Sequence, residues 1–278
     1  MFRKTMTNNA VLTLRASLNE DIFSYLDLLL LEYDEQVKAG DFLYLLNQKI
    51  DCNNRINAEL EAMAKTLYDY WFVQFDFPDQ HGQPYRSSGG KMVYNPTLKR
   101  EVPEGWEVKL VEEILGSAPR SESVPSKEIL ANGRIPVVDQ GTSFICGFTK
   151  NESARLAVKS AHVVFGDHTR IFKLVNFDYA RGADGTQVLI SNKKNAPPHL
   201  LYQMLKDIDL SNYGYARHFK FLKESVITLP TESVALSYEA IAQCWYLKIR
   251  HGIEENQHLT ELRDWLLPLL MNGQVTVD

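Results

Sequence analysis

The chain has 278 residues, of which 45% are hydrophobic and 23% charged, and its formal net charge is −5. This is an ordinary globular composition, with enough apolar residues for a packed core in one large or two small domains. No run approaches the roughly 18 apolar residues that a membrane span needs, and no signal-peptide pattern follows the first residues. We therefore expect a cytoplasmic protein. The three cysteines are far apart, which argues against a disulfide framework or a cysteine-pair metal site.

The first 17 residues carry no clear pattern, and a first helix is predicted from Asn19. Asn19 is a good N-cap, the acidic residues that follow favour the first turn, and Gly40 is a helix stop. The apolar stripe of this helix consists of Ile22, Tyr25, Leu26, Leu29 and Leu30.

A longer helix is predicted from Asp41, its cap, to about residue 75. Apolar or small residues recur in alternating steps of three and four, the spacing of a coiled-coil seam: Leu43, Leu46, Ile50, Leu60, Ala64, Leu67 and Trp71. Asn53 and Asn57 occupy the two intervening positions, and polar residues there fix the register of pairing. Three residues beside the seam predict further packing surface: Ile56, Met63 and Tyr70. The alternative is an ordinary core helix whose asparagines point sideways.

This helix ends in an unusual junction, Tyr68-Asp-Tyr-Trp-Phe-Val-Gln-Phe-Asp-Phe-Pro78, in which Pro78 stops the helix and makes Phe77 extended. Two further motifs follow it: Gly82-Gln-Pro-Tyr-Arg-Ser-Ser-Gly-Gly-Lys-Met92 and Val102-Pro-Glu-Gly-Trp106. The serines and glycines between them are typical of turns. Residues 76–104 are therefore predicted to be a linker.

From residue 105 the hydrophobic period changes from 3.6 to 2, which predicts strands. Short apolar runs cover residues 106–110, 135–138, 144–148, 158–165, 171–175, 188–190 and 226–229. The runs on either side of residues 166–170 predict two strands joined by a polar turn. Pro197 and Pro198 are expected to open a helix over residues 199–207. This middle part is therefore predicted to be an α+β domain.

A last long helix is predicted from Ser237, its cap, to Asn272-Gly273, which stops it. Its apolar residues stay near one face: Ile241, Trp245, Ile249, Ile253, Leu259, Leu262, Leu266 and Leu270. Trp245 and Trp265 are most simply seam anchors. The alternative is that one of them is exposed and docks a partner protein.

Charge is unevenly distributed along the chain. Residues 119–230 carry fifteen Lys and Arg against ten Asp and Glu, so the remainder carries a net charge of −10. A basic middle between acidic helical ends indicates that the middle meets an anionic partner such as nucleic acid.

Two polar clusters in the basic middle contain candidate DNA-contacting residues. The predicted turn carries His168, Thr169 and Arg170, next to Asp167, and the alternative is a plain solvated turn. The second cluster combines aromatic and basic side chains, which suit contacts with both bases and phosphates: Tyr213, Tyr215, Arg217, His218 and Lys220. The alternative is that its aromatic residues belong to the core. Three more basic residues lie in polar loops, where charge alone predicts phosphate contacts: Arg181, Lys193 and Lys194.

The motifs from Tyr68 to Trp106, together with Glu261-Leu-Arg-Asp-Trp-Leu-Leu-Pro-Leu-Leu-Met-Asn-Gly-Gln-Val275, resemble the specificity subunits of type I restriction-modification systems. In that family they mark a conserved spacer helix, the entry to a target recognition domain and a distal conserved helix. The resemblance implies four regions: a helical region over residues 1–75, a linker over 76–104, a target recognition domain over 105–232 and a distal helix over 233–278. Because a full subunit usually carries two recognition domains and this chain has room for one, we expect a half-subunit, either natural or a fragment of a two-domain subunit.

The resemblance also implies that the long helices pack as an antiparallel coiled coil beside the α+β domain. The expected seam includes Leu46, Ile50, Asn53, Asn57, Leu60, Leu67, Ile253, Leu259, Leu262 and Leu266. Such a chain reads one half of a bipartite target in double-stranded DNA and docks the methyltransferase subunits and, through them, the restriction subunit. If two half-subunits form a homodimer, the target is a palindrome. The alternative is a coiled-coil interaction protein that has lost specific DNA binding.

Catalysis by the chain itself is not expected, and no catalytic residue, metal ligand or cofactor site is predicted. Methyl transfer would need Asn or Asp directly before Pro-Pro-aromatic, whereas Asn195-Ala-Pro-Pro-His199 has Ala before the prolines and His after them. The sequence contains no phosphate loop of the GxxxxGK(S/T) form. Nor does it place carboxylates in a recognisable nuclease arrangement.

Overall fold

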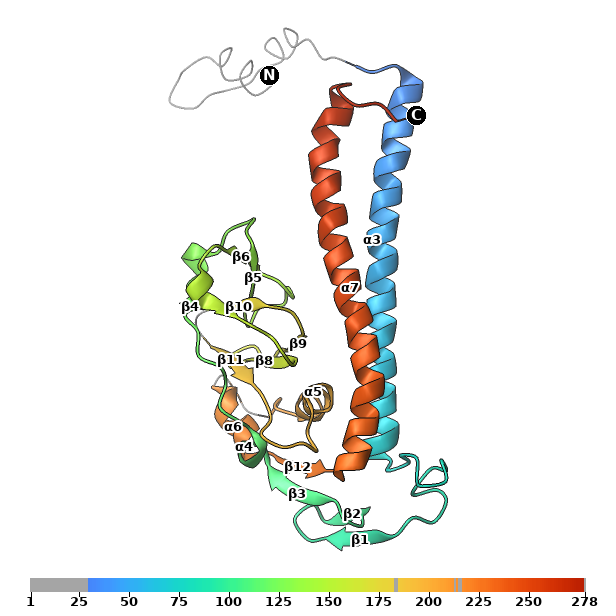
Figure 1. Ribbon diagram of the computed structural model, residues 1–278, viewed down its shortest axis with the longest axis vertical. Helices are drawn as coiled ribbons and strands as arrows, with labels where there is room; N and C mark the ends of the chain where they lie inside the picture. The colour runs from blue at the N-terminus through green and yellow to red at the C-terminus, as the bar shows by residue number, and fades with distance from the viewer. Residues whose placement is uncertain (1–29, 183–184, 213, 215–216, 278) are drawn as a thin grey trace. The chain divides into compact units, whose positions relative to one another are not determined.

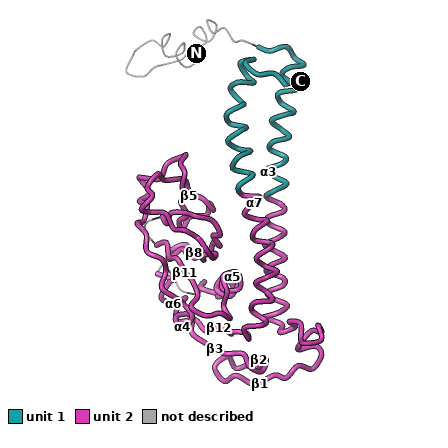
Figure 2. Tube along the Cα trace, in the orientation of Figure 1, with its two compact units in different colours: residues 1–53, 254–278 teal, residues 54–253 magenta. Residues whose placement is uncertain are grey.

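The computed structural model describes residues 30–182, 185–212, 214 and 217–277. The chain divides into two compact units (Figure 2): its two ends, up to Asn53 and from Glu254, form unit 1, and residues 54–253 form unit 2. The helix predicted from Asn19 begins outside the described residues. Among the helices that are described, none has a stretch long and apolar enough to cross a membrane.

Two long helices run through both units (Figure 1): α3 (Tyr33–Tyr68) and α7 (Glu232–Met271). In unit 1 the Arg263 guanidinium donates to the Asn47 side-chain oxygen over 2.9 Å. In unit 2 the Tyr238 hydroxyl donates to the Ala64 carbonyl over 3.1 Å. Positions later in α3 thus meet positions earlier in α7, and the predicted antiparallel helix pair is confirmed.

The two seam asparagines have specific neighbours on α7. Asn53 is buried, and its side-chain amide donates to Glu255 Oε2 (2.7 Å) and Asn256 Oδ1 (2.9 Å). Asn57 packs closely against Gly252, where an added Cβ atom would lie 2.6 Å from the Asn57 oxygen. Polar side chains that find their partners at one register only favour that register.

Exposure along both helices follows the expected seam with two departures. The buried or half-buried positions include Leu46, Ile50, Leu60, Leu67, Ile253, Leu259 and Leu266. Leu262 and Trp265, in contrast, are 39% and 62% exposed. The α7 face towards α3 passes through Arg263 and the buried Leu270, so Leu262 and Trp265 lie beside the seam, and the prediction that Trp265 anchors it is wrong. Trp245 is half-buried against the hydrophobic core.

The long helices continue through residues predicted to start or stop them. Gly40 and Asp41, expected to separate two helices, lie inside α3. Ser237, expected to cap the last helix, lies inside α7 and its hydroxyl donates to the Ser233 carbonyl over 2.9 Å. A glycine costs a helix only about 1 kcal/mol, and most helix stability in proteins comes from tertiary packing. Packing of the pair therefore decides where these helices begin.

The junction after α3 is part of an aromatic core in unit 2. The helix passes into a π-helical turn, Asp69–Val73, and the positive φ of Phe75 (67°) ends the helical path. The rings of Phe75 and Trp106 lie 5.3 Å apart between centroids, and those of Phe72 and Tyr238 lie 5.2 Å apart. The motif residues therefore join the end of α3, the start of the domain and the start of α7 in one cluster.

The predicted linker contains ordered structure. β1 (Met92–Asn95) and β2 (Arg100–Pro103) form an antiparallel hairpin. The Asp76 carboxylate accepts both the N–H (2.7 Å) and the hydroxyl (2.6 Å) of Ser87. These hydrogen bonds favour the ionised form and lower the pKa of Asp76. The segment that enters the domain is thus held at several points.

The rest of unit 2 consists of short strands and helices. The strands are β3 (Glu107–Leu110), β4 (Ser123–Val124), β5 (Ile135–Val138), β6 (Gly147–Thr149), β7 (Arg155–Leu156), β8 (His162–Gly166), β9 (Phe172–Val175), β10 (Tyr179–Gly182), β11 (Thr186–Leu189) and β12 (Val226–Leu229). The helices are α4 (Val111–Ile114), α5 (Pro198–Lys206) and α6 (His218–Glu224), with 3-10 turns at Ser126–Glu128 and Glu152–Ala154. One sheet has the order β4-β10-β5-β6, with β7 also on β10; β8 lies between β11 and β9; and β3 pairs with β12.

The predicted α+β class is confirmed. The β8–β9 hairpin and the start of α5 at Pro198 lie where the sequence predicts them. β10 is missing from the predicted elements because Tyr179 and Ala180 are both buried, so the alternation expected of a half-exposed strand is absent. α6 is also missing, since its residues form part of the second polar cluster.

Candidate nucleic-acid interface

The turn between β8 and β9, residues 167–171, carries three exposed candidate residues: His168, Thr169 and Arg170. Two other loops hold this β8–β9 turn. The Gln140 side-chain oxygen accepts the His168 N–H (3.2 Å), and the Gln140 carbonyl accepts the Thr169 hydroxyl (2.7 Å). From the segment before β11, the Gly185 carbonyl accepts the Asp167 N–H (2.7 Å). The segment after β5 and the segment before β11 therefore converge on one polar turn.

Two glycines allow these segments to approach closely. A Cβ atom at Gly166 would overlap the Thr169 hydroxyl and lie 2.9 Å from the Gln140 Cβ. Gly185 has a φ of +73°, and a Cβ atom there would lie 2.8 Å from the His168 ring. A larger residue at either position would push the loops apart.

Arg170 has an unusual backbone conformation and an exposed side chain. Its φ is +62°, which is uncommon for a residue other than glycine and points to a constrained turn. Its N–H donates to the Gly166 carbonyl (2.8 Å), and its guanidinium donates to the Leu210 carbonyl (3.3 Å). Because a guanidinium carries five N–H donors, it can contact a phosphate or a guanine edge while it keeps this carbonyl contact.

The N-terminus of α6 is tied to the same turn. The N-cap residue, Arg217, provides no side-chain cap. Instead, the Asp167 carboxylate accepts the Phe219 N–H (2.8 Å), and the Asp167 carbonyl accepts the N–H (3.0 Å) and the ring Nδ1 (2.9 Å) of His218. Asp167 is 5% exposed and His218 is 3% exposed. His218 thus lies behind the turn, and its burial contradicts its prediction as a DNA-contacting residue.

The other members of the second polar cluster differ in their surroundings. Arg217 is exposed and directly precedes the residue bonded to the β8–β9 turn. Lys220 is also exposed, and its ammonium lies 3.8 Å from the Glu224 carboxylate one helical turn later. Tyr213 and Tyr215 lie outside the described residues. The structure therefore brings Arg217 to the three exposed residues of the turn.

A buried lysine, which the sequence analysis does not single out, organises the loop over residues 139–143. Lys173 of β9 is 4% exposed, and its ammonium donates to the Asp139 (2.7 Å) and Ser143 (2.6 Å) carbonyls. Burial lowers the pKa of Lys173, and the nearby Asp139 carboxylate, 3.7 Å away, opposes that shift. This loop contains Gln140, so Lys173 supports the β8–β9 turn indirectly. The sequence signal that could have identified Lys173 is its position among the apolar residues of a predicted strand.

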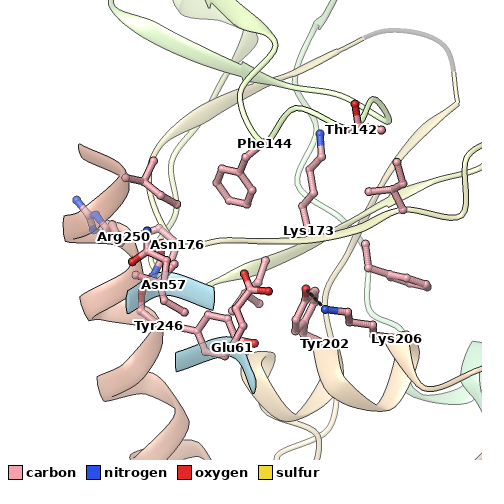
Figure 3. A pocket seen from close by; sticks show the side chains of 15 residues that line it. Asn57, Glu61, Thr142, Phe144, Lys173, Asn176, Tyr202, Lys206, Tyr246 and Arg250 are labelled. Atoms are coloured by element: carbon pink, nitrogen blue, oxygen red, sulfur yellow. Dashed lines mark hydrogen bonds between the residues drawn. The ribbon is translucent and has the colours of Figure 1, made fainter. Parts of the chain in front are cut away.

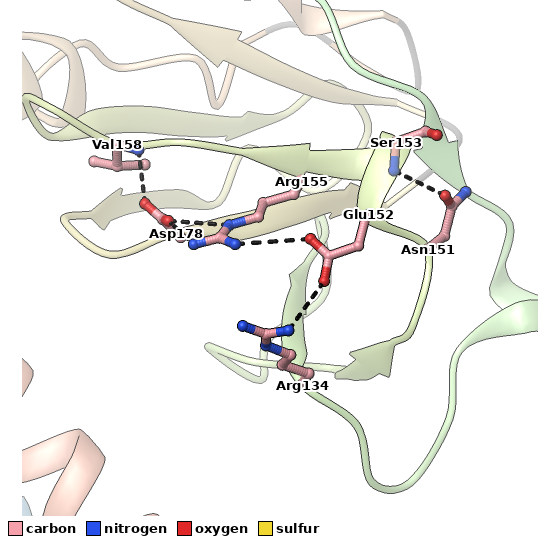
Figure 4. A network of polar contacts seen from close by, with 7 residues as sticks. All are labelled: Arg134, Asn151, Glu152, Ser153, Arg155, Val158 and Asp178. Atoms are coloured by element: carbon pink, nitrogen blue, oxygen red, sulfur yellow. Dashed lines mark hydrogen bonds and ion pairs between the residues drawn. The ribbon is translucent and has the colours of Figure 1, made fainter.

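Part of the basic excess of the domain is neutralised in a separate network (Figure 4). Arg155 donates to the Asp178 carboxylate (3.1 and 2.5 Å) and lies 3.7 Å from Glu152, which in turn is 3.7 Å from Arg134. The Val158 N–H and Arg155 together lower the pKa of Asp178, and Asp178 raises that of Arg155. Arg134 and Arg155 are thus paired with acids.

The three predicted phosphate contacts lie in different places. Arg181 is half-buried in β10, between β4 and β5. Lys193 and Lys194 are exposed and follow the end of β11 that is remote from Gly166 and the β8–β9 turn. The Lys194 ammonium lies 3.9 Å from Glu232 at the start of α7. The two lysines are therefore separate from the turn.

The described residues contain no group of three or more His, Cys, Asp or Glu side chains placed to hold a metal ion. Asp167 and His168, the most enzyme-like pair in the sequence, do not act together, because the Asp167 carboxylate caps α6 while His168 is exposed. What the turn offers is the exposed His168 and Arg170 side chains, which carry N–H donors, on a backbone held by hydrogen bonds. Such donors can contact phosphate oxygens and base edges.

Curated relatives share sequence with most of this chain. The specificity subunit of the type I restriction enzyme MjaIX from Methanocaldococcus jannaschii is 24% identical over 268 residues, covering 88% of this chain and 60% of that protein. The specificity subunit of the type I restriction enzyme HindI from Haemophilus influenzae is 22% identical over 325 residues, covering 92% of this chain and 70% of that protein. The chain thus spans 60% of the length of the first of these relatives. No family model matches the chain.

A solved structure supports the same relationship at the level of the fold. The S subunit of a type I restriction-modification system from M. genitalium matches with a TM-score of 0.52 and 13% identity, over 87% of this chain and 60% of that chain. The resemblance indicated by the motifs of the junction and the last helix is confirmed. The chain is therefore related, in sequence and in fold, to the specificity subunits of type I restriction-modification systems.

Proposed function

We propose that the chain is the DNA-recognition part of a type I restriction-modification enzyme and reads one half of a bipartite target in double-stranded DNA. The β8–β9 turn carries this proposal, because hydrogen bonds to two other segments hold its backbone at Asp167 and His168 and its Thr169 side chain, while the exposed Arg170 is held by Gly166 and Leu210. Base readout needs donors in a fixed geometry. The exposed Arg217 beside the turn adds positive charge for the phosphate backbone.

In this proposal residues 105–232 form the target recognition domain, and α3 and α7 form the spacer. The chain supplies no catalytic residue and acts in the cytoplasm, where the spacer docks the methyltransferase subunits and, through them, the restriction subunit. Exposed apolar residues on the helices support docking: Ile56 (39%), Met63 (48%), Tyr70 (38%) and Trp265 (62%).

We further propose that the enzyme contains two recognition domains, one of which is formed by residues 105–232 of this chain, because a bipartite target has two halves. If two copies of the chain meet in one enzyme, the target is a palindrome. A size measurement on the complex with the methyltransferase subunits tests this step. A single copy of the chain in that complex would contradict it.

Sequencing of methylated adenines in cells that carry the intact system tests the reading function. The expected result is a split target whose two halves are separated by unread base pairs. The chain with its methyltransferase partner should then protect a duplex of that sequence, with an affinity that falls steeply as salt rises, by about 0.9 log units per neutralised phosphate for each tenfold increase. Binding to the methyltransferase without specific DNA protection would instead support the interaction protein that has lost DNA reading.

Arg170→Ala is the sharpest variant of this experiment. Loss of one base or phosphate contact should weaken binding to the mapped target by about 1–3 kcal/mol. Arg134→Ala is the matched control, because the Arg134 side chain is 80% exposed but lies in the Glu152 network. Equal losses in both variants would contradict the assignment of the β8–β9 turn as the reading surface.

A further inference from the structure

One face of α7 carries three residues that contact the domain: Glu239, Tyr246 and Arg250. Their spacing of seven and four places them on one side of the helix. All three contact α5 or the segment after β9, and all lie within unit 2. We call these three residues the latch.

Glu239 supplies a cap that α5 lacks in its own sequence. Pro197 provides no side-chain cap and Pro198 opens the helix, and neither proline has an N–H to satisfy. The first N–H groups of α5, those of His199 and Leu200, both donate to Glu239 Oε2, over 3.1 and 3.4 Å. The His199 ring Nδ1 lies 2.7 Å from Glu239 Oε1. A carboxylate is the preferred group at this end of a helix, so Glu239 fixes the start of α5 against α7.

Tyr246 and Arg250 extend the contact along α7, about two and three helical turns beyond Glu239. The Tyr246 hydroxyl accepts from the Gln203 amide of α5 over 3.1 Å, and both groups are buried. The Asn176 amide donates to the Tyr246 carbonyl (3.0 Å), while the Arg250 guanidinium donates to the Asn176 carbonyl (3.1 Å). The latch therefore holds α5 at its start and its middle, and the segment after β9 as a third point.

Tyr246 and Ile249 of α7 share a hydrophobic core with α5, but the apolar packing next to the latch is interrupted on one side. A cavity of about 290 Å³ lies between the domain and the helices of unit 2, lined on one side by Tyr246 and Arg250 and on the other by Tyr202 and Lys206 (Figure 3). Close-packed interiors resist displacement, whereas a cavity leaves room for movement. Directional hydrogen bonds specify one angle more strictly than apolar contacts do. The latch thus adds directional constraints on the orientation of the domain on α7 to those of the shared apolar core.

We propose that the latch sets the orientation of the recognition domain on the spacer helices, and with it the number of unread base pairs that the enzyme accepts between half-sites. This inference rests on the proposed DNA-reading function. Adjacent base pairs are rotated by about 34°, since B-DNA turns once in about 10.5 base pairs. The next base pair also lies about 3.4 Å further along the DNA axis, so a domain free to rotate and shift by these amounts can reach it without any change in the residues that read DNA. Glu239, Tyr246 and Arg250 are positioning residues in this proposal.

The test compares methylated targets in cells that carry the wild-type system, Glu239→Ala, the double variant Glu239→Ala/Arg250→Ala, or the control Glu261→Ala. Glu261 is an exposed glutamate of α7 whose side chain accepts a hydrogen bond from Gln257 on the same helix. We expect the latch variants to keep both half-site sequences but to methylate targets with one unread base pair more or fewer, at a tenth or more of the wild-type level. The control should keep the wild-type spacing.

A single unchanged spacing in both latch variants would overturn the proposal. If a variant loses methylation altogether, the purified enzyme is titrated with duplexes that differ only in spacing. A flattened preference among spacings supports the latch, and an equal fold-loss at every spacing overturns it. A wild-type system that methylates no split target would contradict the proposed function itself, so the two failures are distinguishable.

Discussion

α5 and α6 begin in the same way but connect different parts of unit 2. Each opens near a buried histidine, neither has a side-chain cap at its own N-cap residue, and each receives a carboxylate from a distant segment. At α6 the carboxylate is Asp167 of the β8–β9 turn, whereas at α5 it is Glu239 of α7. At both helices, a carboxylate from another segment replaces the missing local cap and attaches the helix start to that segment. One attachment builds the candidate reading surface, and the other orients the whole domain.

The largest effect is expected from Asp167→Ala. It leaves the buried end of α6 without its cap, which should lower the free energy of unfolding by about 1–3 kcal/mol. Because the β8–β9 turn loses the side-chain bond of Asp167 to α6 and keeps only the bonds of its backbone carbonyl to His218, affinity for the mapped target should fall at least tenfold. Urea denaturation and fluorescence anisotropy measure the two quantities. Asp51→Ala, on the exposed side of α3, is the control, and an unchanged affinity of Asp167→Ala would contradict the role of the turn.

Glu239→Ala should separate stability from half-site reading. We expect a similar loss of about 1–3 kcal/mol in the free energy of unfolding, because the first N–H groups of α5 lose their acceptor. Affinity for a duplex with a single half-site should stay within about twofold of wild type, since the hydrogen bonds of Glu239 go to α5 and not to the β8–β9 turn. The stability losses of Asp167→Ala and Glu239→Ala should add to within about 0.5 kcal/mol, because the two carboxylates share no partner. Strong coupling between them would mean that the two attachments are not independent.

Lys173→Met tests the support beneath the β8–β9 turn. Removing a buried charge offsets much of the loss of its hydrogen bonds, so the free energy of unfolding should change by less than about 1 kcal/mol. The loop over residues 139–143 loses its two carbonyl contacts, so we expect its amide hydrogens to exchange roughly tenfold faster. Lys127→Met, at an exposed position, is the control. Unchanged exchange in this loop would show that Lys173 does not hold it.

The exposed ion pair of Arg155 and Asp178 should give the smallest effect. Its contribution to stability is the reference against which the less exposed carboxylates of Asp167 and Glu239 are compared. The pKa of Asp178 in the folded chain is below its usual value near 3.8, so the pair stabilises the fold above that value and loses its effect as pH falls through the folded pKa. Asp178→Asn should lower the free energy of unfolding by roughly 0–1 kcal/mol at pH 7. The difference from wild type should shrink as the pH is lowered to about 3, measured by thermal denaturation. A difference in unfolding free energy that grows as the pH falls would contradict a lowered pKa for Asp178.

The sequence predicts the elements better than it predicts their partners. The spacing of Leu46, Ile50 and Leu60 predicts a paired helix, and the polar turn between two apolar runs predicts the β8–β9 hairpin. His218 illustrates the limit, because a histidine among aromatic and basic residues has the composition of a nucleic-acid surface. Its burial depends on the Asp167 carbonyl, 51 residues away in the chain.

What the sequence by itself determined is most of the helices and strands, the α+β class and the family resemblance, which implies the antiparallel partner of the long helix, because periodicity and local motifs record which face of each segment is buried. Only the tertiary structure decided which polar groups meet. The Gln140 contacts with the β8–β9 turn, the Lys173 support of the 139–143 loop and the Glu239 cap on α5 each join segments about 30 to 40 residues apart. No local pattern encodes such a contact, because its geometry exists only after the chain has folded.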